Sequence, residues 1–409
     1  MTHWSNYLIE YLLRDKSILS SALDIMESNQ NYGLYYPVTY WAMPEWVNHL
    51  LKNKHSCLDY LMRNGMTQDV DDFIPYPVGS MFIAKSSALE PLLKKNWEYD
   101  DFPSEPIPAD GTFLHALERL LPFIVKSTGH QEFYYNPGTG DFTEDSSWIF
   151  SKYNNYNEHT LNHLLSLNDI ISFDIFDTLA KREYAEPDYA KYLLPFRLGL
   201  NISGFDFVRV RNDVEYKLRV EAEFKGDVNI YEIYIRLVSE LGLTHDPLEL
   251  ADLEFEIDLE MLSAKDIIIK ILIDQNKVGK KIYIISDTYY MEHHIRKLLY
   301  RIGLRCKYEL FVSSSLRIRK DDGTMWEMIE QYLRSQKKKD KFIHIGDNVC
   351  SDGQIPGDYG LRSFHILNPM DKWQACGFPR IKNVLSIDNP DSIHKWGQLV
   401  CQVGDDPFL

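Results

Sequence analysis

Cysteine is scarce in this chain. The 409 residues include five cysteines, at positions 57, 306, 350, 376 and 401, and no Cys-x-x-Cys pair occurs. An odd, scattered set predicts neither a disulfide framework nor a structural zinc site. The N-terminus also lacks a basic segment followed by an apolar core, which a secretory signal would have. These absences together predict a protein of the reducing cytoplasm.

Long apolar runs and an excess of positive charge are missing as well. The longest strongly apolar stretch, 267–273, is interrupted by Lys270. It is far shorter than the roughly 20 residues needed to cross a bilayer, so no transmembrane segment is predicted. The formal net charge of −16 disfavours nucleic-acid partners, because non-specific binding to nucleic acid needs a basic surface. Hydrophobic residues at 44% and charged residues at 25% are ordinary for a globular protein.

The chain has the length of two or three domains and divides into regions of different composition. Residues 1–130 mix helical spacing with a segment rich in Gly and Pro. Residues 131–156 are rich in Asn, Gly, Tyr, Ser and Asp, which predicts a linker. From 157 to 385, short apolar runs alternate with amphipathic segments, which predicts an α/β domain with a parallel sheet and helices on both faces. Residues 386–409 are interpreted as a C-terminal extension.

Expected strands of the 157–385 domain lie at 169–173, 281–285, 308–312, 342–345 and 362–367. The stretch from about 184 to 265 interrupts this alternation. Its apolar residues, among them Ile230, Ile233, Tyr234 and Leu237, follow helical spacing. We therefore expect a helical insertion between the first and second strands.

Polar residues follow four of these strands in order. Asp174 ends the first strand, Ser286 ends the second, Lys320 follows the third, and Asp347 and Asp352 follow the fourth. The carboxyl ends of parallel strands meet at one edge of a sheet, where ligands bind. Each residue alone is commonly a turn, a cap or a solvated side chain. Their order, each tied to its own strand, favours a common site.

These residue types suit a phosphate ester. The Asp174 carboxylate can attack phosphorus and form a covalent aspartyl-phosphate, while Ser286 and Lys320 hold the phosphoryl oxygens. A divalent cation is needed to screen the two anions. Asp174 and Asp347, with the backbone carbonyl of Phe176, can supply its oxygen ligands, and Mg²⁺ suits such a site.

Residues 157–385 resemble the haloacid dehalogenase superfamily, a large group of mainly phosphohydrolases. The resemblance rests on Asp174 to Thr178, on Ser286, on Lys320 and on the Gly-Asp-x-x-x-x-Asp of 346–352. It implies a Rossmann-like parallel sheet and a cap domain in the helical insertion. It also implies that Asp347 binds metal and Asp352 supports it. The strings at 286–290 and 344–348 are similar to members found with bacterial surface-polysaccharide enzymes.

The chain departs from that superfamily at Phe176. Typical phosphatases of the group carry there an aspartate that protonates the leaving group and activates water, and phenylalanine does neither. Three explanations are open: another acid such as Asp177 or Asp287 or a cap residue acts instead; the substrate is an activated phosphate that needs no strong acid; or the domain binds phosphorylated ligands without turnover. An aromatic residue here also resembles the dehalogenases, which use no metal, whereas the Asp347/Asp352 pair argues for one.

Residues 1–130 resemble the C-terminal half of rhamnan-synthesis-type bacterial glycosyltransferases. The resemblance rests on 79–85, 101–105 and 110–119, and it implies that Asp110 deprotonates an acceptor hydroxyl. The alternative is that Asp110 caps the helix running from Thr112. No nucleotide-binding βαβ unit and no Asp-x-Asp motif precede Asp110, so we expect a partial α/β module that needs a donor-binding partner. The aromatic cluster at 32–46 suits sugar stacking or core packing.

The sequence therefore predicts an Mg²⁺-dependent phosphohydrolase acting on a phosphorylated sugar or a related intermediate of bacterial surface-polysaccharide biosynthesis. Catalytic candidates are Asp174, Asp177, Thr178, Ser286 and Lys320, with Asp110 in the N-terminal segment. The first alternative is a phosphate-binding or scaffolding subunit of a polysaccharide-assembly glycosyltransferase. The second is glycosyl transfer by the N-terminal segment together with a donor-binding partner.

Overall fold

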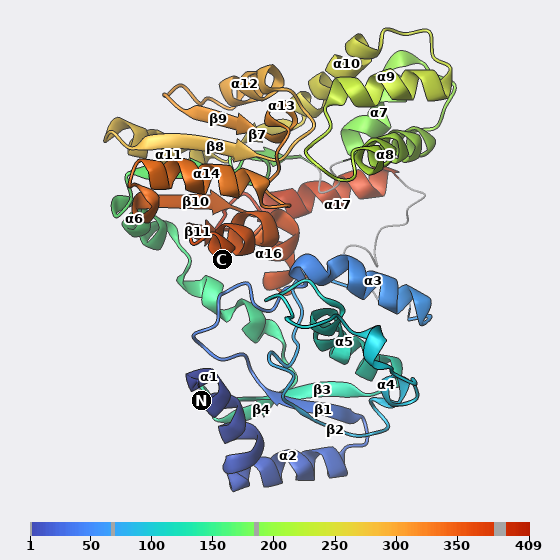
Figure 1. The fold of residues 1–409 in the computed structure, drawn as a ribbon, viewed down its shortest axis with the longest axis vertical. Helices are drawn as coiled ribbons and strands as arrows, with labels where there is room; N and C mark the ends of the chain where they lie inside the picture. The colour runs from blue at the N-terminus through green and yellow to red at the C-terminus, as the bar shows by residue number, and fades with distance from the viewer. Residues whose placement is uncertain (1, 67–69, 184–187, 380–389) are drawn as a thin grey trace. The chain divides into compact units, whose positions relative to one another are not determined.

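The computed structural model describes residues 2–66, 70–183, 188–379 and 390–409 (Figure 1). The chain divides into two compact units, Met1–Asn154 and Asn155–Leu409, called here the N-terminal and C-terminal units. Each unit is built around its own β-sheet. All five cysteines are free thiols, as the sequence predicts. Among the described residues, no helix is long and apolar enough to cross a membrane.

The N-terminal unit holds a four-stranded sheet in the order β2-β1-β3-β4, with strands β1 Tyr32–Pro37, β2 Ile83–Ala84, β3 Gln131–Asn136 and β4 Asp141–Thr143. The central pair β1 and β3 is parallel, and each outer strand is antiparallel to its neighbour. Its helices are α1 His3–Ile9, α2 Lys16–Ser28, α3 Lys54–Arg63, α4 Glu90–Leu93 and α5 Phe113–Ser127, with short 3₁₀ or π turns at Glu10–Arg14, Leu51–Asn53, Tyr99–Asp101 and Ser147–Asn155.

The predicted linker at 131–156 is wrong. Strands β3 and β4 lie in this segment and pair with each other, and β3 also pairs with β1. Phe133 and Tyr134 are buried in the core of the sheet. The Asn and Gly residues at 136–140 form the turn between the two strands, where Gly140 has a positive φ of 80°. Their composition therefore marks a hairpin turn, and the boundary between the units falls after Asn154.

The aromatic cluster at 32–46 divides between core and surface. Tyr35 and Tyr36 are buried and pack against Phe133 and Tyr134, so core packing explains them. Trp41 is 75% exposed and remains available to a ligand or partner.

The C-terminal unit holds a parallel five-stranded sheet in the order β11-β10-β5-β8-β9, which confirms the predicted α/β class. The strands are β5 Ile170–Phe173, β8 Lys281–Ser286, β9 Glu309–Val312, β10 Phe342–Gly346 and β11 Arg362–His365. Each lies within two residues of its predicted range. The helices outside the insertion are α6 Glu158–Ser166, α11 Asp266–Lys277, α12 Glu292–Arg301, α13 Ser313–Leu316, α14 Thr324–Ser335, α15 Ile355–Asp358, α16 Pro369–Ala375 and α17 Pro390–Val403, with short 3₁₀ or π turns at Lys339–Lys341 and Val349–Gln354.

Helices cover both faces of this sheet. Along β5, Ile171 and Phe173 join a core with residues of α6, α11 and α12, whereas Ile170 joins a core with residues of α14 and α15. Successive side chains of a strand point to opposite faces. A strand that is buried on both faces therefore reads as the continuous apolar run seen in the sequence.

The order of the strands reverses beside β5. From β5 the chain builds β8 and β9 on one side of the sheet, and then β10 and β11 on the other. The loops that follow β5 and β10 therefore leave the sheet in opposite directions and open a crevice at its carboxyl edge. Asp174 follows β5 and Asp347 follows β10, so both carboxylates stand at this crevice.

The predicted helical insertion consists of four helices, α7 Tyr189–Leu198, α8 Gly204–Glu221, α9 Ile230–Leu241 and α10 Pro247–Glu260, grouped together in Figure 1. The antiparallel pair β6 Ala180–Arg182 and β7 Leu262–Ala264 connects it to the sheet. Inside the bundle, Arg211 donates to both oxygens of Glu254 at 3.2 and 3.1 Å, and Tyr234 donates to the same carboxylate at 2.6 Å. The start of the predicted insertion at 184–187, and the start of the predicted extension at 386–389, lie outside the described residues.

Candidate active site

Asp174 and Lys320 form the centre of the site. Asp174 lies directly after β5, and its backbone N–H donates to the carbonyl of Ile345 on β10 at 2.9 Å. Lys320 Nζ donates to Asp174 Oδ1 at 2.6 Å and to Asp352 Oδ1 at 2.6 Å. The Asp174 and Lys320 side chains are 9% and 3% exposed. Three residues separated widely in sequence thus meet in one buried charge cluster.

The loop that carries Lys320 is fixed by Asp287. The backbone N–H groups of Lys320 and Asp321 donate to the Asp287 carboxylate at 2.8 and 3.1 Å. Asp287 itself follows Ser286, the last residue of β8. The buried Ser286 hydroxyl has no hydrogen-bond partner among the described residues. Such an orphaned donor at the sheet edge suits an oxygen of a bound phosphoryl group.

Asp352 is held on both of its oxygens. Oδ1 accepts from Lys320 and lies 3.1 Å from His344 Nε2, and Oδ2 accepts from the backbone N–H of Asn348 at 3.0 Å. His344 Nδ1 lies 2.7 Å from the hydroxyl of Ser172 on β5. Asp352 therefore positions Lys320, and this fits the supporting role that the resemblance implies.

Asp347 and Thr178 are also brought together. The Thr178 hydroxyl donates to Asp347 Oδ1 at 2.9 Å, and Thr178 is fully buried. Thr178 therefore orients the Asp347 carboxylate. The intervening Asp177 has a positive φ of 56°, a conformation that aspartate tolerates better than most residues, and this turns the chain sharply after Asp174.

The charges of the cluster are unbalanced. Burial raises the pKa of Asp174, although Lys320 opposes the shift. Burial raises the pKa of Asp347 well above its usual range, and the nearby carboxylates of Asp177 and Asp174 raise it further. Burial opposes the ionisation of Asp352, but Lys320 lowers the pKa of that carboxyl below its usual range. Burial therefore favours the protonated forms of Asp174 and Asp347, because one lysine does not balance the buried carboxylates of the cluster.

These residues fit a magnesium ion. Oxygen atoms of Asp174, Asp347 and Asp352 lie within 4.8 Å of one another. A set of oxygen donors is the kind that Mg²⁺ prefers. Because both oxygens of Asp352 already accept hydrogen bonds, Asp174 and Asp347 fit as ligands and Asp352 as their support.

A pocket of about 230 Å³ opens next to this cluster, at Phe176, between the sheet and the helical insertion. Residues of the sheet domain and of the helical insertion line this pocket. Four of the lining residues are basic: Arg182, Lys191, Arg219 and Arg319. Asp287 also lines the pocket, and burial raises the pKa of its carboxyl to about 6.

Two residues of the site were missed by the sequence interpretation. Arg182, on β6, lies with its guanidinium carbon 4.5 Å from the centre of the Phe176 ring, and no spacing in the motifs points to it. His344 was quoted only as part of a string. Its signal was a polar residue in the otherwise apolar strand Phe342–Gly346, since a fully buried polar side chain needs a partner.

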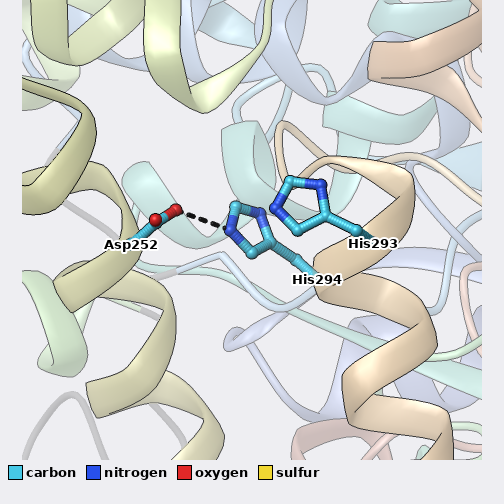
Figure 2. A group of neighbouring side chains, drawn as sticks. All are labelled: Asp252, His293 and His294. Carbon is cyan, nitrogen blue, oxygen red and sulfur yellow. Dashed lines mark hydrogen bonds and ion pairs between the residues drawn. The ribbon is translucent and has the colours of Figure 1, made fainter.

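A second polar cluster joins the insertion to the sheet domain. Figure 2 shows Asp252 of α10 facing His293 and His294 of α12. His294 Nε2 lies 2.9 Å from Asp252 Oδ1, and Tyr231 donates to the same oxygen at 2.8 Å. His294 Nδ1 accepts from the backbone N–H of Met291, so the neutral ring carries its proton on Nε2 and donates it to Asp252. A metal ion would need that nitrogen unprotonated, so the cluster is best described as a hydrogen-bonded tie.

In the N-terminal unit, Asp110 lies next to Arg119, as their places in the sequence suggested. Asp110 Oδ1 accepts from Asn53 at 2.8 Å and lies 3.3 Å from Arg119 Nη2. The alternative that Asp110 caps the following helix is wrong, because the N-cap of α5 is Thr112. Glu105, the other nearby acid, is exposed.

Comparison with known proteins supports the resemblance of the N-terminal segment. Residues 2–130 match the family model described as Rhamnan synthesis protein F. No curated protein sequence matches the chain.

Solved structures similar to this chain include hydrolases of the superfamily that the motifs indicate. A putative HAD hydrolase from Bacillus subtilis bound to magnesium is 18% identical, with 49% of this chain and 89% of that chain covered and a TM-score of 0.36. An L-2-haloacid dehalogenase from Xanthobacter autotrophicus is 15% identical, with 56% and 87% covered and a TM-score of 0.38. An HAD family enzyme from Bacteroides thetaiotaomicron, in complex with magnesium and inorganic phosphate, is 8% identical, with 49% and 95% covered and a TM-score of 0.36. At these values neither activity nor ligands carry over, and the function is argued from the site itself.

Proposed function

We propose that the C-terminal unit is an Mg²⁺-dependent phosphohydrolase that acts through an aspartyl-phosphate on Asp174. The observation that supports this most is the contact of Lys320 with both Asp174 and Asp352 at 2.6 Å, at the carboxyl edge of a parallel sheet. An isolated buried ion pair is costly to desolvate. A buried lysine between two carboxylates, with an unpaired serine hydroxyl nearby, is suited to receiving a phosphoryl group.

Each residue has a defined task in this proposal. Asp174 attacks phosphorus, because it follows β5 at the carboxyl edge of the sheet and its carboxylate contacts Lys320. Ser286 donates its unpaired hydroxyl to a phosphoryl oxygen, and Lys320 neutralises charge on that group. Asp352 keeps Lys320 in place. Mg²⁺, held by Asp174, Asp347 and the Phe176 carbonyl, would screen the repulsion between the carboxylate and the phosphoryl anion.

The substrate class comes from the other half of the chain. Residues 2–130 match a rhamnan-synthesis family, and we propose that the substrate is a phosphorylated sugar or a related intermediate of bacterial surface-polysaccharide biosynthesis in the cytoplasm. A polysaccharide-assembly glycosyltransferase is the proposed partner. For the N-terminal unit itself, Asp110 beside Arg119 is the proposed base of a transferase that needs a donor-binding partner.

Phosphate release tests the proposal. Wild type and Asp174→Asn are compared on a panel of sugar phosphates and an aryl phosphate, with Mg²⁺ and with a chelator. We expect release that needs Mg²⁺ and disappears in Asp174→Asn, because an amide is not a nucleophile. Glu292→Gln, a change in an exposed ion pair of α12, serves as the control and should leave release unchanged. Release by Asp174→Asn equal to that of wild type would contradict the proposal.

Phe176 favours one alternative, a subunit that binds phosphorylated ligands and does not turn them over. That alternative expects phosphate to bind without release from any compound on the panel. Asp174→Asn would then change only the affinity.

A further inference from the structure

Arg182 lies next to Phe176, the residue that stands where typical phosphatases of the resembling superfamily carry their general acid. Its guanidinium carbon lies 4.5 Å from the centre of the Phe176 ring. Its nearest carboxylates, Asp177 and Asp258, lie 3.7 and 3.8 Å away, beyond hydrogen-bond distance. The buried Arg182 Nε has no hydrogen-bond partner among the described residues. A guanidinium thus faces the site with hydrogen-bonding capacity to spare.

The other acids beside the pocket already have partners. Asp287 accepts from the backbone N–H groups of Lys320 and Asp321, so its carboxylate is held by the loop that presents Lys320. Asp177 lies 3.7 Å from Arg182 and is thus engaged in an ion pair. Neither is placed as a free proton donor, so the pocket offers positive charge in place of an acidic proton.

The charge of the pocket follows the same pattern. Arg319 also lines it, and the buried Arg319 Nε likewise has no hydrogen-bond partner in the described part of the chain. Two guanidinium groups, one from β6 and one from the loop before Lys320, thus line the same pocket as Phe176. Arginine presents a planar set of donors that matches a phosphate group.

We propose that the substrate is a phosphoanhydride, the terminal phosphoryl group of a diphosphate, whose second phosphate is bound by Arg182 and Arg319. The inference rests on the proposed phosphohydrolase function and specifies its leaving group. An alkoxide leaving group is strongly basic and needs a proton donor, whose loss costs about 10²–10⁴-fold in rate. A phosphate leaving group has a second pKa of about 6, so it departs as an anion, and a fixed guanidinium stabilises it without transferring a proton.

The reaction balances without a general acid. An Asp174 oxygen forms a bond to the terminal phosphorus, and the bond from that phosphorus to the bridging oxygen breaks. The bridging oxygen keeps the electron pair and leaves as part of the second phosphate, paired with Arg182. Water then attacks the aspartyl-phosphate, Asp174 departs as a carboxylate, and both protons of the water stay on the released dihydrogen phosphate.

The first test measures how kcat/KM of the wild-type protein depends on the leaving group, and it needs no variant. We compare kcat/KM for inorganic pyrophosphate with that for glucose 6-phosphate, an alkyl monoester, both with Mg²⁺. The proposal expects pyrophosphate to be favoured by at least about 10²-fold, the size of the missing acid's contribution. Equal values would overturn it while leaving the phosphohydrolase function standing. Release from neither compound, nor from an aryl phosphate, would overturn the phosphohydrolase function and this inference with it.

Substitution of Arg182 then tests whether this residue binds the second phosphate. Arg182→Gln is expected to lower kcat/KM for pyrophosphate by about 10²-fold and to change that for an aryl phosphate much less. Arg197→Gln, a change in an exposed ion pair of the same insertion, is the matched control and should leave both unchanged. An equal loss on both compounds in Arg182→Gln would contradict the assignment. Phe176→Asp is expected to raise activity on glucose 6-phosphate, because it restores a carboxyl at the leaving group.

Binding gives a readout that does not depend on turnover. Methylenediphosphonate, a diphosphate analogue that is not cleaved, is titrated calorimetrically into the full chain with Mg²⁺. We expect it to bind at least about tenfold more tightly than inorganic phosphate, and Arg182→Gln to remove this preference, since an arginine donates charge-assisted hydrogen bonds to a phosphate group. Equal affinity for the two probes in the wild type would overturn the proposal.

Discussion

Gly346 is the residue where space in the site is tightest. A Cβ at this position would overlap the Asp352 carboxylate, which cannot move without releasing Lys320, His344 or Asn348. We expect Gly346→Ala to lower phosphate release by at least about 10²-fold, through misplacement of Lys320. Gly357→Ala is the matched control, because a Cβ there meets nothing within 4 Å. Full activity of Gly346→Ala would show that Asp352 does not hold Lys320 as described.

The buried carboxyls make magnesium binding depend on pH. The pKa values of Asp174 and Asp347 are raised, so in the absence of metal both keep protons above the usual pH range of an aspartate. A ligand must lose its proton to bind the cation. We therefore expect the affinity for Mg²⁺, measured calorimetrically, to rise steeply between about pH 5.5 and about pH 8. An affinity that stays constant over this range would contradict the assignment of these two ligands.

A raised carboxyl pKa also determines whether the free energy of unfolding rises or falls with pH. A carboxyl with a folded-state pKa raised above its unfolded value contributes stability below the unfolded value, near pH 3.8, and loses it as pH rises through the folded value. For Asp287 that loss extends from about pH 3.8 to its folded-state pKa of about 6. Without Mg²⁺, the contribution of Asp287 to the free energy of unfolding, taken as the difference between wild type and Asp287→Asn, should therefore fall as the pH rises from about 4 to about 7. Urea denaturation with a chelator measures this, and an increase over the range would contradict the shift.

Residues of the site were predictable where a motif ties them to a strand end. Asp174, Ser286, Lys320, Asp347 and Asp352 each follow a strand that the apolar pattern reveals. Arg182 was not predictable, because it reaches the site from a strand at the base of the insertion, and its place depends on how the insertion folds back.

Among the elements, α10 and α12 are joined by the Asp252 tie shown in Figure 2. Asp252→Ala would leave the Tyr231 hydroxyl and the His294 Nε2–H without their acceptor. We expect it to lower the free energy of unfolding by about 1 kcal/mol, the net contribution of a typical hydrogen bond. Glu256→Ala removes a neighbouring α10–α12 ion pair whose two side chains are about half exposed, so it should cost less. Equal effects in urea denaturation would show that Asp252 is an ordinary surface residue.

Among the secondary-structure elements, the sequence predicted the strands of the C-terminal unit but led to the wrong assignment of a hairpin turn as a linker. The central strands β5, β8 and β10 were found because they are buried on both faces and largely apolar. The edge strands β9 and β11 are partly exposed, and each still has a short apolar run within it or directly after it. The segment 131–156 was assigned to a linker because Asn and Gly are common to linkers and hairpin turns alike. The burial of Phe133 and Tyr134, which separates the two cases, depends on contacts with β1 that local composition does not encode.

For the whole molecule, the division after Asn154 predicts that the two proposed activities can be separated. Residues 155–409, expressed alone, should release phosphate with kcat/KM close to that of the full chain, because all residues of the proposed site lie there. Activity that is lost in the fragment and restored by adding residues 1–154 would show that the site needs both units.

Asp110 provides the complementary test in the full chain. Asp110→Asn keeps a hydrogen-bond acceptor for Asn53 and removes the proposed base. It should abolish surface-polysaccharide assembly in cells while leaving phosphate release in vitro unchanged. Normal assembly would contradict the proposed role of the N-terminal unit.

The most direct test of the account is to trap the covalent intermediate. The full chain is mixed with Mg²⁺ and pyrophosphate, quenched in acid within the first turnover, and analysed by mass spectrometry of its peptides. We expect one phosphoryl group on the peptide that contains Asp174, absent from Asp174→Asn and from a reaction with chelator. Phosphate release by the wild type without any labelled peptide, or with the label on another residue, would contradict it.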